Sequence, residues 1–530
     1  MTYTKSFSSR FQGASGNEVY IILAAGGGEP SPPLCSYMKA GGKMHLGAGK
    51  CILAPEGLKP RTDPVQWRHT KRKGTVTDMG MTAFLILTIL EIALAVRTCR
   101  KKPDRKTWCR ERLVLRAAEA AAVVLHLVFS PAQKWRFVPV LGFLAVLLVI
   151  AALALLLGRK RESDMKKPAG AVVGSVLCVL LFAFLLVPAC LFTGYNGLPV
   201  SGAHPIGETS AILVDASRTD PFEQDGSFRE VPVHFYYPAD AAAGERFPLV
   251  VFSHGAFGYY QSNTSTYMEL ASNGYVVAAL DHPHHAFFTQ DTDGKTVLVD
   301  TAFLNAALNL NDSTDKQEQF ALYREWMGLR VPDMNFALDA IKAAAENGTT
   351  DGSWFVPAKE SEKLHTALAM TDVSRIGLMG HSMGGATSVQ LGRERSDVAA
   401  VIDLDGTMLG EYLGVENGEM LVSRVPYPVP VLDFNNWESY IDMEEYRAQG
   451  YPYPNVEVVD RAETGFSVGI RDAKHMDFTD LPLLSPTLGK MLGSGARSTE
   501  EIMTAVNSLV LQFFNCYLKG EGDFTVHDTY

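Results

Sequence analysis

Ser382 lies in the segment GHSMG at 380–384, which fits the pattern G-x-S-x-G. An apolar run at 374–380 leads into it and a helical pattern at 384–394 follows, so the serine stands on a predicted strand-to-helix turn. Small residues on both sides allow the tight backbone that such a turn requires. The N–H groups of the following helix favour developing negative charge. These features predict a serine that attacks a carbonyl carbon; an ordinary glycine-rich turn is the alternative.

His475 is the expected general base for this serine. A hydroxyl needs a base to become a good nucleophile, and the base needs a carboxylate to orient it. With this motif, the acid and then the histidine follow the serine along the chain. Only His475 and His527 follow Ser382, and His527 lies three residues from the C-terminus. We therefore expect the base in RDAKHMDFTDL, at His475; a surface histidine is the alternative.

Two aspartates in the segment VAAVIDLDG at 398–406 are candidates for the orienting acid. Residues two apart in a strand point to the same side, so alternation does not separate Asp403 from Asp405. Asp405 stands at the end of the predicted strand, where loops build the site, whereas Asp403 lies deeper in the sheet. We expect Asp405 to be the acid and keep Asp403 as the alternative.

An oxyanion hole for this serine requires two backbone N–H groups. One comes from Met383, the residue after the nucleophile. The other is expected from the loop in VVFSHGAFGYY at 250–260, which follows an earlier apolar strand. Ala256 is the candidate donor in that loop, with Phe257 as the second choice.

Residues 200–530 alternate short apolar runs with helical patterns, which predicts one soluble domain with a mostly parallel sheet covered on both faces. The expected strands are 231–237, 247–253, 274–280, 374–380, 398–404, 429–434 and 466–472, and the expected helices are 264–273, 323–347, 384–394 and 499–518. In such a sheet the carboxyl ends of the strands meet at one edge. The predicted serine, acid and histidine would meet there.

Residues 79–194 have the pattern of transmembrane helices. The uncharged segments 137–157 and 171–192 are long enough to cross a hydrocarbon layer of ~30 Å. The segment 79–96 is a third candidate despite Glu91. The segment 113–129 carries Arg116, Glu119 and His126, so an amphipathic or a buried helix is its alternative. Basic residues concentrate at 97–112 and 159–167, which favours a multi-pass region of four helices with the C-terminal domain on the extracytoplasmic side.

Residues 1–78 are rich in Gly and Pro and show no sustained periodicity, which predicts disorder. The alternative is an over-extended reading frame, with translation starting at Met79 or Met81. A basic cluster at 68–73 conflicts with an exterior N-terminus, and a start at Met79 would remove that conflict.

The composition excludes some partners. The net charge is −10 and no basic block occurs in the second half, so we expect no nucleic acid. The seven cysteines lack metal or redox spacing. The segment DHPHHAFFT at 281–289 would allow a metal site, but adjacent His284 and His285 cannot easily face one ion. We therefore interpret that segment as a loop near the mouth of the pocket.

The segments FSHGAFG, GHSMGGAT, DLDG and HMDFTDL together resemble the platelet-activating-factor acetylhydrolases and their bacterial relatives, within the dienelactone-hydrolase-like and chlorophyllase-like α/β-hydrolases. The resemblance covers about residues 205–520 and implies an α/β-hydrolase fold. It implies Ser382, Asp405 and His475 as the triad and Ala256 and Met383 as oxyanion donors, with no metal or other cofactor. The family cleaves short or oxidised acyl esters of phospholipids, and some bacterial relatives cleave simple esters or polyesters. The multi-span N-terminus and Met383, where an aromatic residue is common, depart from the animal enzymes.

The sequence therefore predicts a membrane-anchored serine ester hydrolase that acts on a small ester or phospholipid-like substrate. A peptidase, a thioesterase or a polyester hydrolase on the same scaffold is the alternative within this class. A non-catalytic binding domain is the alternative from another class, and its signature would be a broken triad. A transporter would require polar residues inside the spans, and these are few.

Overall fold

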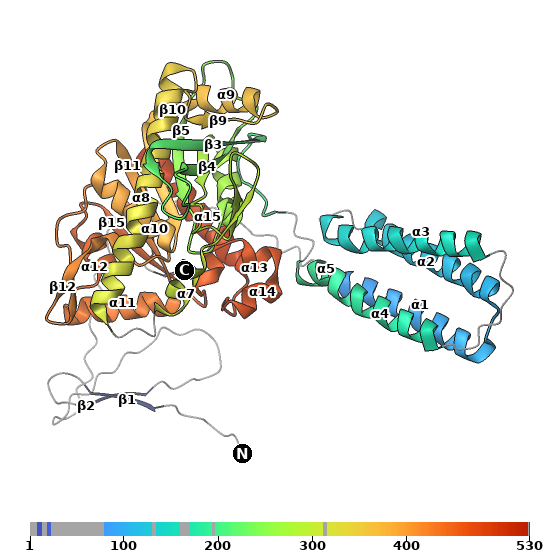
Figure 1. Ribbon diagram of the computed structural model, residues 1–530. Coiled ribbons are helices and arrows are strands. Elements are labelled where there is room, and N and C mark those ends of the chain that lie inside the picture. Colours follow the sequence, from blue (N-terminus) through green and yellow to red (C-terminus); the bar gives the residue numbers. More distant parts are fainter. Residues whose placement is uncertain are drawn as a thin grey trace, which may run out of the picture. The chain divides into compact units, whose positions relative to one another are not determined.

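The computed structural model describes residues 8–12, 18–22, 79–129, 134–158, 169–192, 197–310, 315–527 and 529–530 (Figure 1). The chain divides into two units, Met1–Gly74 and Thr75–Tyr530. In the first unit, strand β1 (Ser8–Gln12) pairs antiparallel with β2 (Glu18–Ile22). The other positions of 1–78 lie outside the described residues, so the predictions of disorder and of a later start there stay predictions.

The segment predicted to span a membrane is helical. The helices are α1 (Met79–Lys101), α2 (Arg105–Phe129), η1 (Lys134–Phe137), α3 (Val138–Gly158), α4 (Ala169–Leu185) and α5 (Val187–Leu191). Helix α1 packs on α2 and α4, and α2 packs on α3. Two helical stretches, Gly80–Lys101 and Lys134–Leu157, are long and apolar enough to cross a membrane, which is weak evidence for membrane association.

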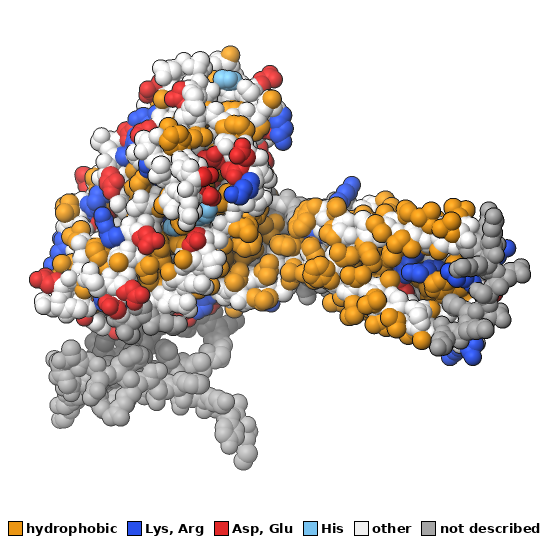
Figure 2. Space-filling model, viewed as in Figure 1, with side chains coloured by type: hydrophobic (Ala, Val, Ile, Leu, Met, Phe, Trp, Pro, Cys, Tyr) orange, Lys and Arg blue, Asp and Glu red, His pale blue; other side chains and the backbone are white. Residues whose placement is uncertain are grey.

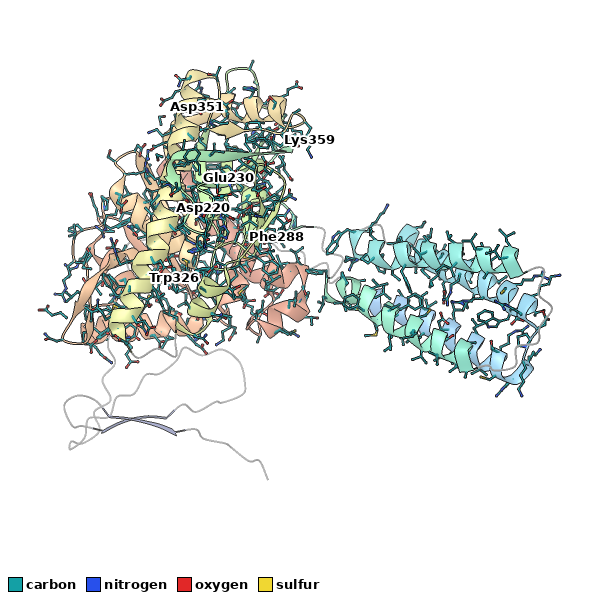
Figure 3. The ribbon with its side chains drawn as sticks, viewed as in Figure 1. Asp220, Glu230, Phe288, Trp326, Asp351 and Lys359 are labelled. Atoms are coloured by element: carbon teal, nitrogen blue, oxygen red, sulfur yellow. The ribbon has the colours of Figure 1, made fainter. Side chains whose placement is uncertain are left out.

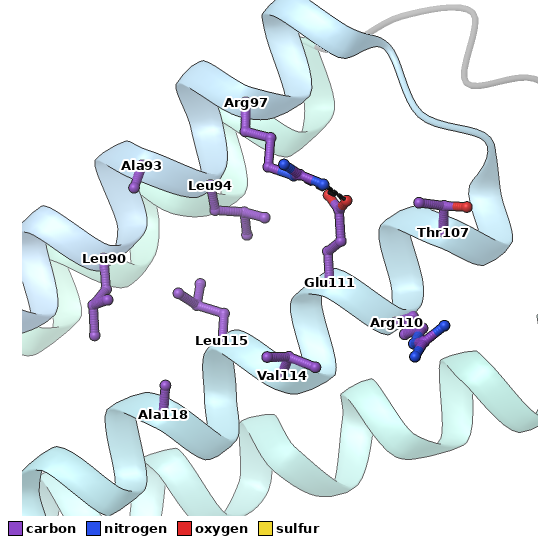
Figure 4. A pocket seen from close by; sticks show the side chains of 10 residues that line it. All are labelled: Leu90, Ala93, Leu94, Arg97, Thr107, Arg110, Glu111, Val114, Leu115 and Ala118. Atoms are coloured by element: carbon purple, nitrogen blue, oxygen red, sulfur yellow. Dashed lines mark hydrogen bonds and ion pairs between the residues drawn. The ribbon is translucent and has the colours of Figure 1, made fainter.

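The outer surface of these helices is largely apolar (Figure 2). Between α1 and α2 lies an open groove of about 530 Å³, which runs past Leu90 and Leu115 (Figure 4). The Nε of Arg97 donates to Oε1 of Glu111 at 2.9 Å at one end of this groove. Inside the bundle, the buried Arg116 is paired with Glu119, at 2.6 Å.

A nine-stranded sheet forms the centre of residues 197–530, in the order β15-β14-β11-β10-β5-β6-β4-β3-β9. The strands from β15 to β6 run parallel, and β4, β3 and β9 add antiparallel pairs. Their bounds are β3 (Ile206–Thr219), β4 (Phe228–Pro238), β5 (Phe247–Ser253), β6 (Val276–Leu280), β9 (Trp354–Phe355), β10 (Thr371–His381), β11 (Val398–Leu404), β14 (Val431–Asn436) and β15 (Gly465–Ile470). The predicted parallel sheet is therefore present, with an antiparallel extension on one side.

Helices cover both faces of this sheet because its strands alternate two sets of buried side chains. Leu249 and Val251 of β5 face a core that includes residues of α8 (Lys316–Asn347), α9 (Ser361–Ala369) and α10 (Met383–Glu394). Val250 and Phe252 face a second core with α6 (Thr264–Ser272) and α15 (Thr499–Phe514). Every residue of β5 is buried, which explains its unbroken apolar sequence.

The smaller elements lie in the connections. They are η2 (Tyr260–Asn263), β7 (Phe288–Gln290), β8 (Thr296–Leu298), α7 (Thr301–Leu308), η4 (Leu409–Glu411), β12 (Tyr412–Glu416), β13 (Glu419–Val422), α11 (Trp437–Gln449), α12 (Pro454–Arg461), η5 (His475–Phe478), α13 (Leu481–Leu484), α14 (Pro486–Met491) and η6 (Asn515–Lys519). The sequence did not predict β3 or β9, the two strands beyond β4 at the antiparallel end.

Candidate active site

Ser382 occupies the turn between strand β10 and helix α10. Its backbone is in a strained region, with φ 56° and ψ −123°, and its N–H donates to the carbonyl of Leu404 at 2.9 Å. A Cβ on Gly384 would lie 2.0 Å from the carbonyl oxygen of Ser253, and one on Gly380 would lie 2.2 Å from the backbone of Gly384. The glycines of GHSMG are therefore required by close backbone packing, as the sequence predicts.

Asp405 and His475 are brought together from two neighbouring connections. Asp405 directly follows β11, and His475 opens η5 after β15. The Oδ2 of Asp405 lies 2.7 Å from Nδ1 of His475. Its Oδ1 accepts the backbone N–H of Asn436 at 2.6 Å and the Asn436 side-chain amide at 3.0 Å. The buried carboxylate thus has partners on both oxygens and a fixed direction toward the imidazole.

Asp403, the alternative acid, has a different environment. It lies inside β11, opposite Asp433 of β14, and its Oδ1 accepts the N–H of Gly406 at 3.1 Å. Burial, with the nearby charge of Asp433, raises the pKa of Asp403 well above its ordinary value. Of the two aspartates, Asp405 is the one that contacts His475, so the geometry favours Asp405.

The pair of Asp405 and His475 stabilises a positive imidazole. Burial lowers the pKa of His475, but its hydrogen bond to Asp405 and the charge of that carboxylate outweigh this, and the pKa rises above 6.5. Burial raises the pKa of Asp405, but the bond with His475 outweighs it and the pKa falls below its ordinary value. The side chain of His475 is 46% exposed, so part of the ring is accessible. Such a base can hold the proton that a nucleophile releases.

His475 also lies beside the residue that precedes the serine. Its ring centroid is 4.7 Å from that of His381, and its carbonyl oxygen is 3.2 Å from Nε2 of His381. Burial and then the charge of His475 lower the pKa of His381 to about 3, so His381 is neutral. In the described part of the chain, the Oγ of Ser382 does not form a hydrogen bond with His475. A catalytic hydrogen bond of this kind commonly tightens when substrate binds.

The loop after β5 contains the second predicted oxyanion donor. The N–H of Phe257 donates to the carbonyl of His285 at 3.2 Å, so it is not available to a substrate. Within the described part of the chain, the N–H of Ala256 has no acceptor, and Met383 is the first residue of α10, where N–H groups lack helical partners. The geometry therefore favours Ala256 over Phe257, together with Met383.

The three histidines of 281–289 face different neighbours. Near them, Trp326 lies on helix α8 (Figure 3). It is buried, and its ring centroid is 5.6 Å from that of Phe303. The pairs are His282 with Asp333, His285 with Phe303 and His284 with Phe222. In the ranges that the structure describes, no three His, Cys, Asp or Glu side chains converge as metal ligands would.

Three polar residues near the site were not found from the sequence. Asn436 donates to Asp405 and also caps helix α11; the cap is typical of asparagine, but the sequence does not signal the contact with Asp405. Arg330 and Asp333 are fully buried on helix α8. Their spacing of three residues places them on one face of the helix, the face that also contains its buried apolar residues, and this was the available signal.

Residues 226–530 match the model of the family described as platelet-activating factor acetylhydrolase, isoform II. The chain belongs to this family. The match covers more than half of the sequence and confirms the family predicted from the sequence motifs. With the mixed sheet and the strand-to-helix turn at Ser382, it identifies an α/β-hydrolase-like fold.

Curated relatives agree with this assignment. Platelet-activating factor acetylhydrolase of Cavia porcellus is 23% identical over 299 residues, which is 53% of this chain and 60% of the relative. The Bos taurus protein is 24% identical over 300 residues, 55% of this chain and 62% of the relative. The match thus spans about three fifths of the length of these relatives. Among solved structures, a ferulic acid esterase from Streptomyces cinnamoneus is 23% identical with a TM-score of 0.44, over 61% of this chain and 93% of the esterase.

Gly384→Ala tests the backbone packing that positions the serine. The added methyl would meet the Ser253 carbonyl, so the turn must shift and we expect serine reactivity to fall about 10²-fold. The rate of fluorophosphonate labelling measures this. Gly328→Ala on α8 is the matched control, because its methyl meets nothing within 4 Å. Equal labelling of the two variants would contradict the role assigned to the packing.

The pH dependence of kcat/KM for a simple ester tests the Asp405–His475 pair. A general base must be neutral, and the pKa of His475 is raised, so activity should fall as the pH drops through a value above 6.5. In Asp405→Asn the hydrogen-bonded charge that raises the pKa is lost. We expect that variant to be much less active and to have its acidic limb at lower pH. A wild-type limb below 6.5 would argue against the pair.

Proposed function

We propose that this protein is a serine carboxylic ester hydrolase. Ser382 attacks the ester carbonyl while His475 accepts its proton, and Asp405 holds the imidazole and stabilises its charge. The alcohol leaves with the proton from His475, and water then cleaves the acyl-enzyme. The main support is the bond of 2.7 Å between Asp405 and His475, beside the residue that precedes the strained serine.

The proposed substrate is a short-chain or lipid-type carboxylic ester. Family membership supports this choice, since the curated relatives bear the name platelet-activating factor acetylhydrolase. The N–H groups of Ala256 and Met383 are the proposed donors to the oxyanion. Each such donor typically contributes a factor of about 10² to 10³ in kcat.

We also propose that the hydrolase domain lies at a membrane, on the extracytoplasmic side. Two apolar helices support membrane association, and the apolar outer surface of α1–α4 suits contact with lipid (Figure 2). Eight Lys or Arg residues lie in 97–112, around the connection between α1 and α2. Basic loops are retained in the cytoplasm, which favours four spans and an exterior C-terminal domain.

Ser382→Ala tests the catalytic proposal. A fluorophosphonate probe should label the wild-type protein and leave the variant unlabelled, because the variant lacks the nucleophile. Hydrolysis of p-nitrophenyl acetate should fall by orders of magnitude in the variant while its melting temperature is retained. Parallel assays with a thioester and a peptide surrogate compare the substrate classes. Normal ester hydrolysis by Ser382→Ala would overturn the mechanism.

Cys99 tests the membrane topology, because it is exposed on α1 close to the basic connection. In a variant whose other cysteines are replaced, we expect Cys99 to be protected from an impermeant maleimide in intact cells. Permeabilised cells should show labelling. The protein should also stay in the membrane fraction after an alkaline carbonate wash. Labelling in intact cells, or release by carbonate, would contradict the proposed arrangement.

A further inference from the structure

Arg330 reaches the loop after β5 from helix α8, on one side of the sheet. Its side chain is fully buried. Its Nη1 donates to the carbonyl of His254 at 2.5 Å, and its Nη2 donates to the carbonyl of Gly255 at 3.2 Å. One guanidinium therefore binds two consecutive backbone carbonyls. Its planar fork of donors suits two acceptors at once.

The second of these carbonyls shares a peptide unit with the N–H of Ala256. In a planar trans peptide the C=O and the N–H point in opposite directions, and no cis bond occurs in the described chain. The Gly255 carbonyl faces Arg330, and Nδ1 of His254 lies 2.6 Å from the same oxygen. The Ala256 N–H consequently points away from Arg330. A Cβ on Gly255 would lie 3.2 Å from Cβ of Ser382, so this peptide passes beside the nucleophile.

We propose that Arg330 is a positioning residue that keeps the Gly255–Ala256 peptide oriented with its N–H available to the oxyanion. This inference rests on the proposed hydrolase function. If the peptide flipped, its carbonyl would face the developing negative charge and Arg330 would lose an acceptor in a buried site. Removing one hydrogen-bond acceptor from a buried guanidinium, which would keep only the His254 carbonyl and His285, is unfavourable. The bond to the His254 carbonyl fixes the preceding peptide at the same time.

The surroundings of Arg330 keep it charged and immobile. Burial lowers the pKa of Arg330 to about 9, which leaves the guanidinium positive at neutral pH. Its Nε lies 3.2 Å from Nδ1 of His285, whose carbonyl in turn accepts the N–H of Phe257. Asp333, one turn further along α8, accepts two hydrogen bonds from the buried Arg229. The loop is thus held on both sides of Ala256.

Arg330→Met tests this role with p-nitrophenyl butyrate as substrate. The variant keeps an unbranched side chain and most of its volume but cannot bind the carbonyls. We expect kcat to fall about 10²-fold, as for loss of one oxyanion donor, with KM little changed. The acidic limb of the pH profile should stay in place, because Asp405 and His475 are untouched. Arg330→Lys, which keeps the charge and can reach one carbonyl, should have an intermediate kcat.

Arg393→Met is the matched control. Arg393, near the end of α10 that lies away from Ser382, also binds two consecutive carbonyls, those of Val425 and Pro426 in the connection between β13 and β14, together with Glu411. Its loss should lower the melting temperature and leave kcat unchanged. An unchanged kcat in folded Arg330→Met, with a wild type whose activity depends on Ser382, would overturn the inference alone. An inactive and unlabelled wild type would overturn the proposed function instead.

A crystal structure of the wild-type protein with a phosphonate bound to Ser382 decides the matter if Arg330→Met does not fold. We expect a phosphonate oxygen within about 3 Å of the N–H groups of Ala256 and Met383, with the Gly255 carbonyl still on Arg330. A phosphonate oxygen bound to other donors, or a Gly255 carbonyl turned away from Arg330, would contradict the inference.

Discussion

The strained backbone at Ser382 is the constraint on which the site depends. A non-glycine residue at φ 56° and ψ −123° costs about 1–3 kcal/mol, so its surroundings must impose it. The bond from its N–H to the Leu404 carbonyl ties it to β11, and the contact between Gly384 and Ser253 ties helix α10 to the end of β5. The neighbouring parallel strands therefore fix the serine from both sides.

The same kind of strain recurs along the carboxyl edge of the parallel strands. Among the described non-glycine residues, seven have positive φ, and five of them follow parallel strands: His284 after β6, Phe257 after β5, Ser382 after β10, Asp405 after β11 and Asp472 after β15. Each of these residues lies one to four residues after the end of its strand. The side chains that follow are gathered at one edge, where open sheets of this type bind ligands. The sheet supplies the rigidity that keeps such turns in place.

The sequence predicted the structural features that local patterns indicate, and missed the contacts that depend on strand register. The G-x-S-x-G turn, the order of serine, acid and histidine, and the alternation of strands and helices are local, so the parallel sheet and the positions of Ser382 and His475 followed from them. Asn436 is different, because its contact with Asp405 exists only when β14 lies beside β11 in the observed register. Arg330 likewise meets the loop after β5 only through the packing of α8 on the sheet. The local sequence around either residue does not indicate these contacts.

Stability alone does not account for the buried charges around Arg330. Replacing a buried ion cluster by apolar side chains of similar volume is often neutral or stabilising, so the cluster is weak evidence for a stabilising role. An apolar core would cover the loop after β5 equally well but would leave the His254 carbonyl without this donor, and the Gly255 carbonyl would keep only the N–H of Gly258 at 3.1 Å and Nδ1 of His254 at 2.6 Å. The guanidinium gives each of them a partner in a fixed direction, and the nearby charge of Asp333 favours its charged form. We therefore attribute this energetically unfavourable cluster of buried charges to the orientation of the Gly255–Ala256 peptide beside Ser382.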